Sequence, residues 1–285
     1  MTSKGDRKCF DGLTTVNVEL TSRCNKACWM CGRRKVERDY PELAMDYGDM
    51  DFALVERIAR QLPSNMVVQL HNNGEALLYP NFGQAVDLFA AQITNIVTNG
   101  KLLVEKADEI VGKLDTLAIS IIENDPEAGE QRKIVEEFLR IKGEANPYTI
   151  LRLNGAVDKD AWRDLGLPMA TRNIHSPMGS YAYQNRGPTI PEVGFCLDFM
   201  NHLAIDRRGQ VSICVRFDPE RLGVIGDAAS EDLVDIWNSP RRLGWMRAQV
   251  AGKRASIPLC ARCEFWGVPT GWGDEYESGV RYDAQ

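Results

Sequence analysis

The sequence predicts an α/β fold, in which six parallel strands alternate with helices as an open sheet or a barrel and a smaller region follows. Two observations indicate this fold. Apolar runs of strand length alternate with amphipathic stretches over roughly the first 180 residues, and the pattern changes near Ser176. A third observation concerns chemistry: most of the eight cysteines fall into two groups, one in each region.

The alternation in the first region defines each element in turn. The predicted strands are Val16–Leu20, Met66–Leu70, Ile93–Val97, Leu117–Ile121, Tyr148–Leu153 and Ala170–Ile174. The predicted helices are Asp51–Leu62, Phe82–Ala91, Lys101–Leu114, Glu127–Lys142 and Asp158–Leu165. We expect Asn81 and Asp158 to be helix N-caps. Strands that alternate with helices in this way form parallel βαβ units.

The second region differs in composition. The stretch Pro177–Pro191 is rich in Gly, Pro and Tyr and is expected to be irregular, so we place a domain boundary at about residue 185. This divides the chain into a domain of residues 1–185 and a domain of residues 186–285. The predicted elements of the second domain are a hairpin of Leu203–Asp206 and Val211–Val215, and helices at Leu233–Trp237 and Pro240–Val250.

Composition and charge exclude some classes of protein. The formal net charge is -6 and the pI about 5.3, which argues against a general nucleic-acid binder. No window approaches the roughly 18 apolar residues of a membrane span, and the N-terminal residues MTSKGDRKCFDGL lack the apolar stretch of a signal peptide. We therefore expect a cytoplasmic protein with no membrane partner. The run Arg33–Lys35 is either a solvated face or a docking patch for an acidic electron donor.

The first group of cysteines has a spacing that favours an iron–sulfur cluster. Cys24, Cys28 and Cys31 form a C-x3-C-x2-C motif directly after the first predicted strand. Three thiolates on a short loop can hold three irons of a cubane and leave the fourth iron open to a ligand. A structural zinc site, the alternative, usually takes four protein ligands. With only three histidines in the chain, a mixed Cys/His zinc site is not favoured.

The cysteine loop, CNKACWMC, resembles the cluster loop of the radical S-adenosylmethionine superfamily. The resemblance implies a partial (β/α)6 TIM-like barrel with a catalytic 4Fe–4S cluster. In that family the open iron chelates the amino and carboxylate groups of S-adenosylmethionine, and reductive cleavage yields a 5′-deoxyadenosyl radical that abstracts hydrogen from the substrate. The family usually has an aromatic residue near the adenine before the third cysteine, whereas this chain has Met30.

The segment after the second predicted strand, HNNGE, is similar to the GGEP motif of the same family. Only Gly74 and Glu75 match, because Ala76 replaces the proline. The resemblance implies that this segment contacts the methionyl amino group of the cofactor. The residue types suit that role, since glycine permits a close backbone approach and a carboxylate pairs with an ammonium. The alternative is an ordinary turn.

Three more residues are candidate cofactor contacts at the carboxyl ends of the next strands. The Thr98–Gly100 segment resembles the TNG element of the family and contributes Asn99. Ser120 ends the fourth strand, and similar family members place a polar residue there against the ribose or carboxylate of the cofactor. Arg152 on the fifth strand is expected to face the same cavity. Core polar residues and ordinary turns are the alternatives.

The second group of cysteines suits a closed site with four thiolates. Cys196 and Cys214 are spaced C-x12-G-x4-C, and Cys260 and Cys263 form C-x2-C. Spacing alone leaves zinc and a 4Fe–4S cluster open. The stretch 196–266 resembles a shortened SPASM domain, called Twitch, which implies one auxiliary 4Fe–4S cluster that transfers electrons. Two such clusters are then expected in all, and Cys9 remains as a free thiol.

The resemblance extends to the radical dehydrogenases that oxidise aminocyclitols, and it implies a two-electron oxidation of a small polar substrate. A flavodoxin or ferredoxin is the expected electron donor. Proton removal requires further groups, and the candidates in the interdomain link are His175, Tyr181, Tyr183 and Arg186. Packing or surface roles are their alternatives. A peptide maturase is the rival within the same chemistry, and a non-catalytic electron-transfer or zinc-structural protein is the rival outside it.

Overall fold

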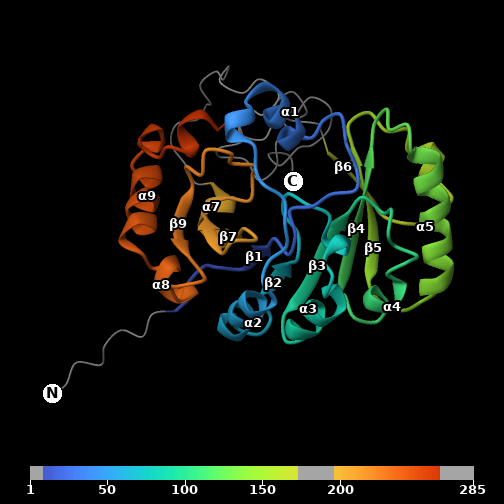
Figure 1. The fold of residues 1–285 in the computed structure, drawn as a ribbon, viewed down its shortest axis with the longest axis horizontal. Helices are drawn as coiled ribbons and strands as arrows, with labels where there is room; N and C mark the ends of the chain where they lie inside the picture. The colour runs from blue at the N-terminus through green and yellow to red at the C-terminus, as the bar shows by residue number, and fades with distance from the viewer. Residues whose placement is uncertain (1–8, 173–195, 264–285) are drawn as a thin grey trace.

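The computed structural model describes residues 9–172 and 196–263, which share one sheet in the order β6-β5-β4-β3-β2-β1-β7-β8-β9 (Figure 1). The strands are β1 (Thr15–Val18), β2 (Val67–Gln69), β3 (Ile93–Thr98), β4 (Thr116–Ile122), β5 (Tyr148–Asn154), β6 (Met169–Arg172), β7 (His202–Ile205), β8 (Gln210–Ser212) and β9 (Val224–Asp227). Strands β1 to β6 are parallel to their neighbours, which confirms the predicted α/β fold.

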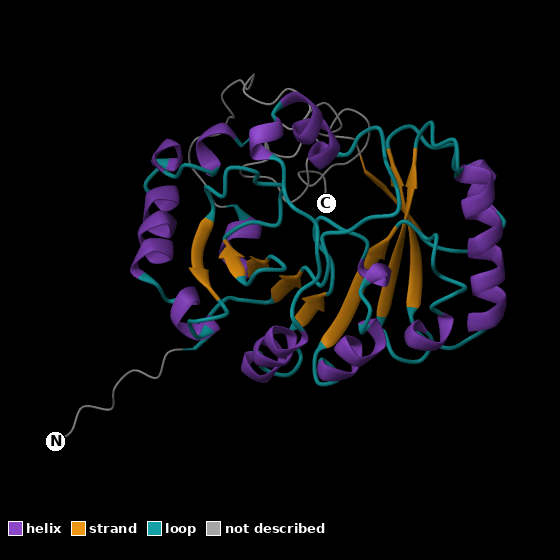
Figure 2. Ribbon diagram, viewed as in Figure 1, coloured by secondary structure: helices purple, strands orange, loops and turns teal. Residues whose placement is uncertain are grey.

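Helices line the outer face of the parallel strands, as Figure 2 shows. They are α2 (Phe52–Gln61), α3 (Phe82–Leu88), α4 (Ala107–Ile110), α5 (Ala128–Lys142) and α6 (Asp160–Arg163). Apolar side chains of α2, α3 and α5 join those of the strands in one buried core. Burial of this apolar surface is the main stabilising term of the fold. Helix α1 (Gly32–Asp39) instead lies at the carboxyl ends of the strands (Figure 1).

The two faces of the sheet differ in chemistry. Successive residues of a strand point to opposite faces, so apolar residues on one face alternate with polar residues on the other. The inner face carries a polar row in register across four strands, formed by Asn17, Gln69, Asn95 and Thr116. The Asn95 Nδ2 donates to Thr116 Oγ1 at 2.7 Å. The inner face is therefore available for polar ligands, whereas the outer face packs against the helices.

The second region continues the sheet of the first. Strand β7 pairs with β1 in parallel, and β8 and β9 follow as antiparallel strands. Its helices are α7 (Leu197–Asn201), α8 (Leu233–Trp237) and α9 (Pro240–Val250), with 3-10 turns at Arg254–Ser256 and Cys260–Arg262. The buried Trp237 donates its Nε1–H to Asp11 O at 3.0 Å and so ties α8 to the start of the chain. The predicted domain boundary lies outside the described residues.

Most predicted elements are present, and their differences have local causes. The predicted helix Lys101–Leu114 is helical only at Ala107–Ile110: residues 101–106 form turns, and Gly112 at φ 74° follows the C-cap residue Val111 and ends the helix. The N-cap of α6 is Lys159, although Asp158 Oδ1 accepts the Asp160 amide at 3.0 Å as a cap would. Helices α8 and α9 have the predicted bounds.

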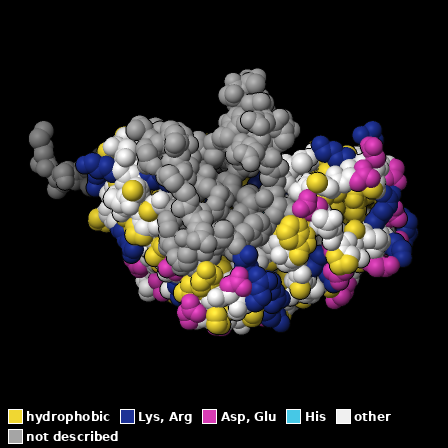
Figure 3. All heavy atoms as spheres, turned by 90° about the horizontal axis from the view of Figure 1, so that it is seen from above, with side chains coloured by type: hydrophobic (Ala, Val, Ile, Leu, Met, Phe, Trp, Pro, Cys, Tyr) yellow, Lys and Arg dark blue, Asp and Glu magenta, His cyan; other side chains and the backbone are white. Residues whose placement is uncertain are grey.

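The surface flank formed by α5 is mixed in charge. Lys/Arg and Asp/Glu side chains alternate on the side where α5 lies, as the space-filling view shows (Figure 3). Pairs such as Arg132 with Glu136 at 2.8 Å connect successive turns of the helix. No helix within residues 9–172 and 196–263 combines the length and hydrophobicity that crossing a bilayer requires.

Candidate functional site

The first three cysteines lie on the loop that connects β1 to α1. Cys31 is the N-cap residue of α1, and its backbone N–H donates to Cys28 O at 3.1 Å. The pKa of the Cys28 thiol is raised to about 12, first by burial and then by the negative charges of Cys31 and Cys24. The three sulfur atoms therefore share one environment, in which a positively charged metal would stabilise the thiolates.

An ion-pair network holds this loop against the loop that follows β4. Lys26, which lies between the first two cysteines, places its Nζ 2.5 Å from Asp125 Oδ2 and 3.3 Å from Glu127 Oε2. Both Lys26 and Asp125 are nearly inaccessible to solvent. Trp29 donates its Nε1–H to Glu123 O at 3.0 Å. Two side chains of the cysteine loop, Lys26 and Trp29, thus attach it to the loop that follows β4.

The predicted cofactor residue Asn99 lies beside the same loop. Its Nδ2 donates to Asn25 Oδ1 at 2.8 Å and approaches Cys24 Sγ at 3.9 Å. The neighbouring Lys101 Nζ lies 3.4 Å from Asn25 O. The turn after β3 and the cysteine loop therefore meet at one point, as the order of the motifs predicts.

The predicted cofactor residue Glu75 is buried and connects two loops. Its carboxylate accepts the Thr98 Oγ1 hydroxyl at 2.7 Å and the Asn99 amide at 2.8 Å. The Leu77 amide donates to the same carboxylate at 3.3 Å. Burial raises the pKa of Glu75, and these hydrogen bonds oppose the shift. A carboxylate offers about four acceptor sites, so one remains for the predicted ammonium.

Gly74 occupies a position that no side chain fits. A Cβ atom there would lie 2.1 Å from Thr21 O and 2.8 Å from Arg23 O. The Glu75 amide donates to Arg23 O at 2.8 Å across the same contact. The close approach is therefore made between the segment after β2 and the chain's own cysteine loop. The sequence predicts a close backbone approach here, and the structure identifies this partner.

Arg33 has a role that the sequence does not indicate. Its side chain is only 3 % exposed, and its Nη1 donates to Ser22 O and to Asn73 O, the latter at 2.7 Å. The guanidinium lies over the Tyr47 ring at 4.6 Å. Both interpretations of the run Arg33–Lys35 as an accessible patch are therefore wrong for Arg33. Its charge is used internally to join the cysteine loop to the segment after β2.

Replacement of Arg33 by Met is expected to lower the free energy of unfolding by about 2–4 kcal/mol, because the Ser22 and Asn73 carbonyls lose their donor and Glu37 loses an ion pair at 3.9 Å. Urea denaturation measures this change. Arg38 lies on the same helix with its side chain 70% exposed, so Arg38→Met is the matched control and should change stability by less than about 0.5 kcal/mol. Equal losses in both variants would contradict the bridging role.

The remaining predicted cofactor residues are spread over the mouth of the sheet. Ser120 and Arg152 are in register on β4 and β5, so their side chains point to the same face. Met30 is half-buried in the cysteine loop. His71 is half-buried, with its Nδ1 3.2 Å from the Val97 amide; burial, followed by the charge of Arg152, lowers its pKa to about 3. His71 is therefore neutral and oriented by the backbone.

The second group of cysteines comes from three segments of the second region. Cys196 precedes α7, Cys214 follows β8, and Cys260 and Cys263 bound the last 3-10 turn. Burial, followed by the charges of Cys196 and Cys263, raises the pKa of the Cys260 thiol. The pKa of Cys196 is raised to about 11 by burial, Asp198 and Cys263. These mutual effects require the thiols to be neighbours.

Two buried polar residues that the sequence analysis does not identify support this second group. Gln249 is inaccessible to solvent; its Oε1 accepts the Cys196 amide at 3.2 Å and its Nε2 donates to Cys260 Sγ at 3.7 Å. Arg254 donates its Nη1–H to Cys260 O at 2.7 Å and to Cys263 O at 3.3 Å. Each residue spans two cysteines, so both fix the geometry of the thiols.

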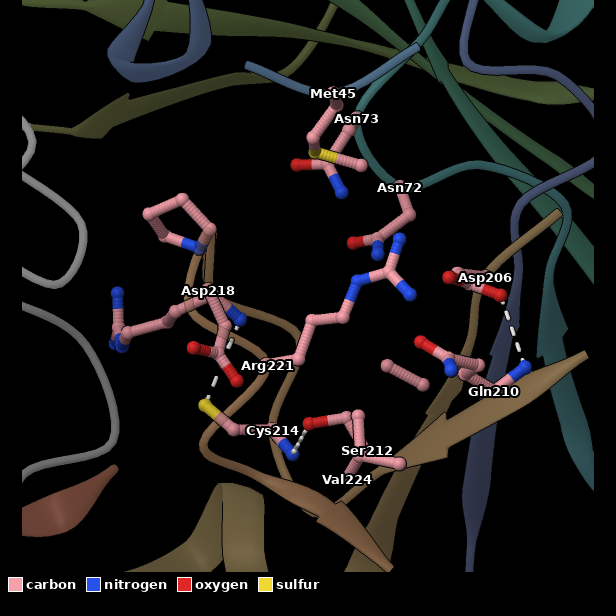
Figure 4. A pocket seen from close by; sticks show the side chains of 13 residues that line it. Met45, Asn72, Asn73, Asp206, Gln210, Ser212, Cys214, Asp218, Arg221 and Val224 are labelled. Carbon is pink, nitrogen blue, oxygen red and sulfur yellow. Dashed lines mark hydrogen bonds between the residues drawn. The ribbon is translucent and has the colours of Figure 1, made fainter. Parts of the chain in front are cut away.

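A pocket lies between the two regions. Asn72 and Asn73 after β2 contribute one wall, whereas Ser212, Cys214 and residues of the β8–β9 loop contribute the other (Figure 4). The Arg221 side chain extends across the pocket toward Asn72 (Figure 4). Cys214 thereby connects the pocket wall to the second group of thiols. The pocket was not predicted, because its walls are far apart in the sequence.

Some predictions are not tested by the structure. The candidate catalytic residues lie outside the described residues; they are His175, Tyr181, Tyr183 and Arg186. Within residues 9–172 and 196–263, no three Cys, His, Asp or Glu side chains are already arranged around a common metal position. The ligand sets of both clusters therefore stay predictions. Cys9 is exposed and forms no disulfide with a described cysteine, and its predicted state as a free thiol stays a prediction.

Comparison with known proteins gives one family match and one curated relative. Residues 196–264 match SPASM, an iron–sulfur cluster-binding domain. The relative is the S-adenosyl-L-methionine-dependent 2-deoxy-scyllo-inosamine dehydrogenase of Niallia circulans. It is 25% identical over 273 residues, which are 90% of this chain and 94% of the relative. The predicted resemblance at the second group of cysteines is thereby confirmed.

Solved structures share the fold. BtrN in complex with AdoMet and 2-DOIA is 19% identical, with a TM-score of 0.61, over 90% of this chain and 95% of BtrN. Streptococcus suis SuiB bound to S-adenosylmethionine is 18% identical, with a TM-score of 0.59, over 88% of this chain and 72% of SuiB. SuiB has also been solved with the precursor peptide SuiA; that structure is 17% identical, with a TM-score of 0.53, over 88% of this chain and 71% of SuiB. Together, these matches show that residues 196–264 are similar to a SPASM domain, that the chain resembles an S-adenosyl-L-methionine-dependent dehydrogenase over most of its length, and that it shares the fold of proteins solved with S-adenosylmethionine.

Proposed function

We propose that this enzyme carries out a two-electron oxidation of a small polar substrate. The observation that carries the proposal is the combination of three thiols on one fixed loop with four further thiols in a SPASM domain. The curated relative, which matches over nearly the whole chain, is a dehydrogenase. Removal of hydrogen from a carbon needs an electron acceptor afterwards, and a closed cluster is suited to accept one electron.

The residues present fit the cofactors that this function requires. Cys24, Cys28 and Cys31 would hold a 4Fe–4S cluster with one open iron, and the thiols around Cys260 would hold a second cluster. S-adenosylmethionine bound at the first cluster would supply the radical that removes hydrogen from the substrate. The close contact at Gly74 brings Glu75 beside the cysteine loop, where its remaining acceptor site can bind the cofactor ammonium.

The protein's own contribution is positioning. The network of Lys26 with Asp125 and Glu127 holds the cysteine loop, and Arg33 fixes the opposite side of that loop. Met30, Asn99 and Ser120 are the proposed contacts of the cofactor outside its amino group. A flavodoxin or ferredoxin is the proposed electron donor. These fixed contacts would hold the cofactor in one orientation before the substrate binds.

Modification of a peptide is the second candidate function. The observation that favours it is the shared fold with SuiB, which has been solved with a precursor peptide. This chain spans about 71% of SuiB, whereas it spans 94% of the dehydrogenase relative. A dedicated peptide-recognition region would need additional chain length, so we favour the small substrate. A short precursor gene beside the gene for this chain would support the peptide instead.

Anaerobic reconstitution tests the proposed function. We expect about eight irons per chain, as two cubanes require, and release of 5′-deoxyadenosine when the reconstituted protein is reduced with S-adenosylmethionine present. Iron content and chromatographic detection of 5′-deoxyadenosine are the two measurements. About four irons, or bound zinc, with no 5′-deoxyadenosine would instead indicate a non-catalytic electron-transfer or zinc-structural protein.

A further inference from the structure

A buried glutamine lies against the second group of cysteines. Gln249, near the end of α9, is inaccessible to solvent. Burying a side-chain amide costs free energy unless its polar atoms form hydrogen bonds. The Oε1 of Gln249 accepts the Cys196 amide at 3.2 Å, and its Nε2 donates to Cys260 Sγ at 3.7 Å. Both contacts are made to cysteines of the second group, so this polar side chain serves that group.

The backbone determines which way the Gln249 amide faces. The Cys196 amide is a donor, so only the oxygen of the Gln249 side chain can accept from it. The NH2 group is then the part that faces Cys260 Sγ. A rotated amide would lose the bond to Cys196 and place an oxygen against the Cys260 sulfur. The N–H···S contact is therefore set by the hydrogen bond to the backbone.

The contact between Gln249 and Cys260 is shielded from water. Cys260 is 8% exposed, and in such surroundings a hydrogen bond is electrostatically stronger than in water. The backbone amide of Arg216 makes a second contact of this kind, to Cys214 Sγ at 3.5 Å. Two sulfurs of the group thus face N–H donors, and the one from Gln249 belongs to a side chain that can be replaced.

We propose that Gln249 raises the reduction potential of the second 4Fe–4S cluster through its hydrogen bond to Cys260 Sγ. This inference rests on the proposed function, in which that cluster accepts an electron. Reduction makes a cluster and its thiolates more negative, so an N–H donor to a sulfur stabilises the reduced state more than the oxidised state. A higher potential makes the cluster a better acceptor for the single electron that the proposed oxidation releases.

A redox titration of the reconstituted enzyme, followed by electron paramagnetic resonance, tests the proposal. The closed cluster is the one whose signal does not change when S-adenosylmethionine is added. Gln249→Met removes the donor in a side chain of similar length. Reduction of this cluster should become about tenfold less favourable, which is about 59 mV for a one-electron couple. Gln249→Glu keeps an acceptor for the Cys196 amide but loses the donor, so its potential should fall at least as far.

The matched control is Gln92→Met. Gln92 is also buried, but its Nε2 donates to two carbonyls, Leu62 O at 3.0 Å and Pro63 O at 3.2 Å, and not to a sulfur. It precedes β3 at the amino end of that strand, opposite the end that meets the cysteine loop. This variant loses comparable buried hydrogen bonds and should keep the potential of both clusters.

Three outcomes would overturn the proposal. These are an unchanged potential in either Gln249 variant that keeps about eight irons, an equal shift in Gln92→Met, or loss of the second cluster in both Gln249 variants. The last would make Gln249 a purely structural residue. Failure of the proposed function is distinguishable, because the unaltered enzyme would then lack a second cubane or release no 5′-deoxyadenosine.

Discussion

Cys28→Ala is expected to abolish release of 5′-deoxyadenosine, whereas Cys260→Ala is expected to retain it and to lose only turnover of substrate. The reason is the separate position of the two groups of thiols. Cys28 shares its environment with the other cysteines of the β1–α1 loop, and Cys260 shares its own with the cysteines of the SPASM domain. Each variant should lose one cubane, so iron should fall from about eight to about four per chain.

Cys9→Ala is the control for these two variants. Its thiol is exposed and free, so this variant should keep both clusters and full activity. Iron analysis, electron paramagnetic resonance and 5′-deoxyadenosine release on the same preparations give the complete comparison. If Cys28→Ala keeps about eight irons, or if Cys260→Ala loses 5′-deoxyadenosine release while still folded, the assignment of the two sites is wrong.

The sequence predicted the sheet well because strand signals are local. The run that became β3 and most of the run that became β5 bury every second side chain, and the run that became β4 is apolar enough to bury most of its residues. Helix α1 was not predicted, because its sequence, GRRKVERD, has one apolar side chain, Val36, and no helical apolar period. Strand β9 was not predicted either, because Gly223 and Gly226 interrupt the apolar pattern of a strand. Pairing with β8 stabilises it instead.

In the candidate site too, the features with a local sequence signal were predicted and those that depend on tertiary contacts were not. Cysteine spacing within C-x3-C-x2-C and C-x2-C is a short-range signal, and the resemblance to a SPASM domain added Cys196 and Cys214, so all seven proposed cluster ligands could be named from the sequence. The residues that fix these cysteines could not be named from the sequence. Arg33, Gln249 and Arg254 act on backbone groups that are either far away in the chain or buried by tertiary packing. An arginine is usually exposed, so nothing in the local sequence indicates that Arg33 is buried.

Gly74→Ala is expected to lower 5′-deoxyadenosine release by roughly 100-fold, the cost of displacing reacting groups by about 1 Å. The added Cβ would meet Thr21 O at 2.1 Å and Arg23 O at 2.8 Å. Both are backbone atoms, which cannot rotate away as a side chain would, so the segment after β2 and the cysteine loop must separate. That movement would break the hydrogen bond from the Glu75 amide to Arg23 O and carry Glu75 away from Asn99.

The matched control is Gly129→Ala on α5, where a Cβ meets no atom within 4 Å and alanine favours the helix. This variant should keep full activity and gain slightly in stability, so the pair separates the effect of the contact from that of losing a glycine. Calorimetric binding of S-adenosylmethionine should weaken in Gly74→Ala alone, because the displaced Glu75 no longer presents its fourth acceptor site. Unchanged affinity and activity in Gly74→Ala would show that the two loops can separate without affecting the cofactor, and that their contact serves the fold alone.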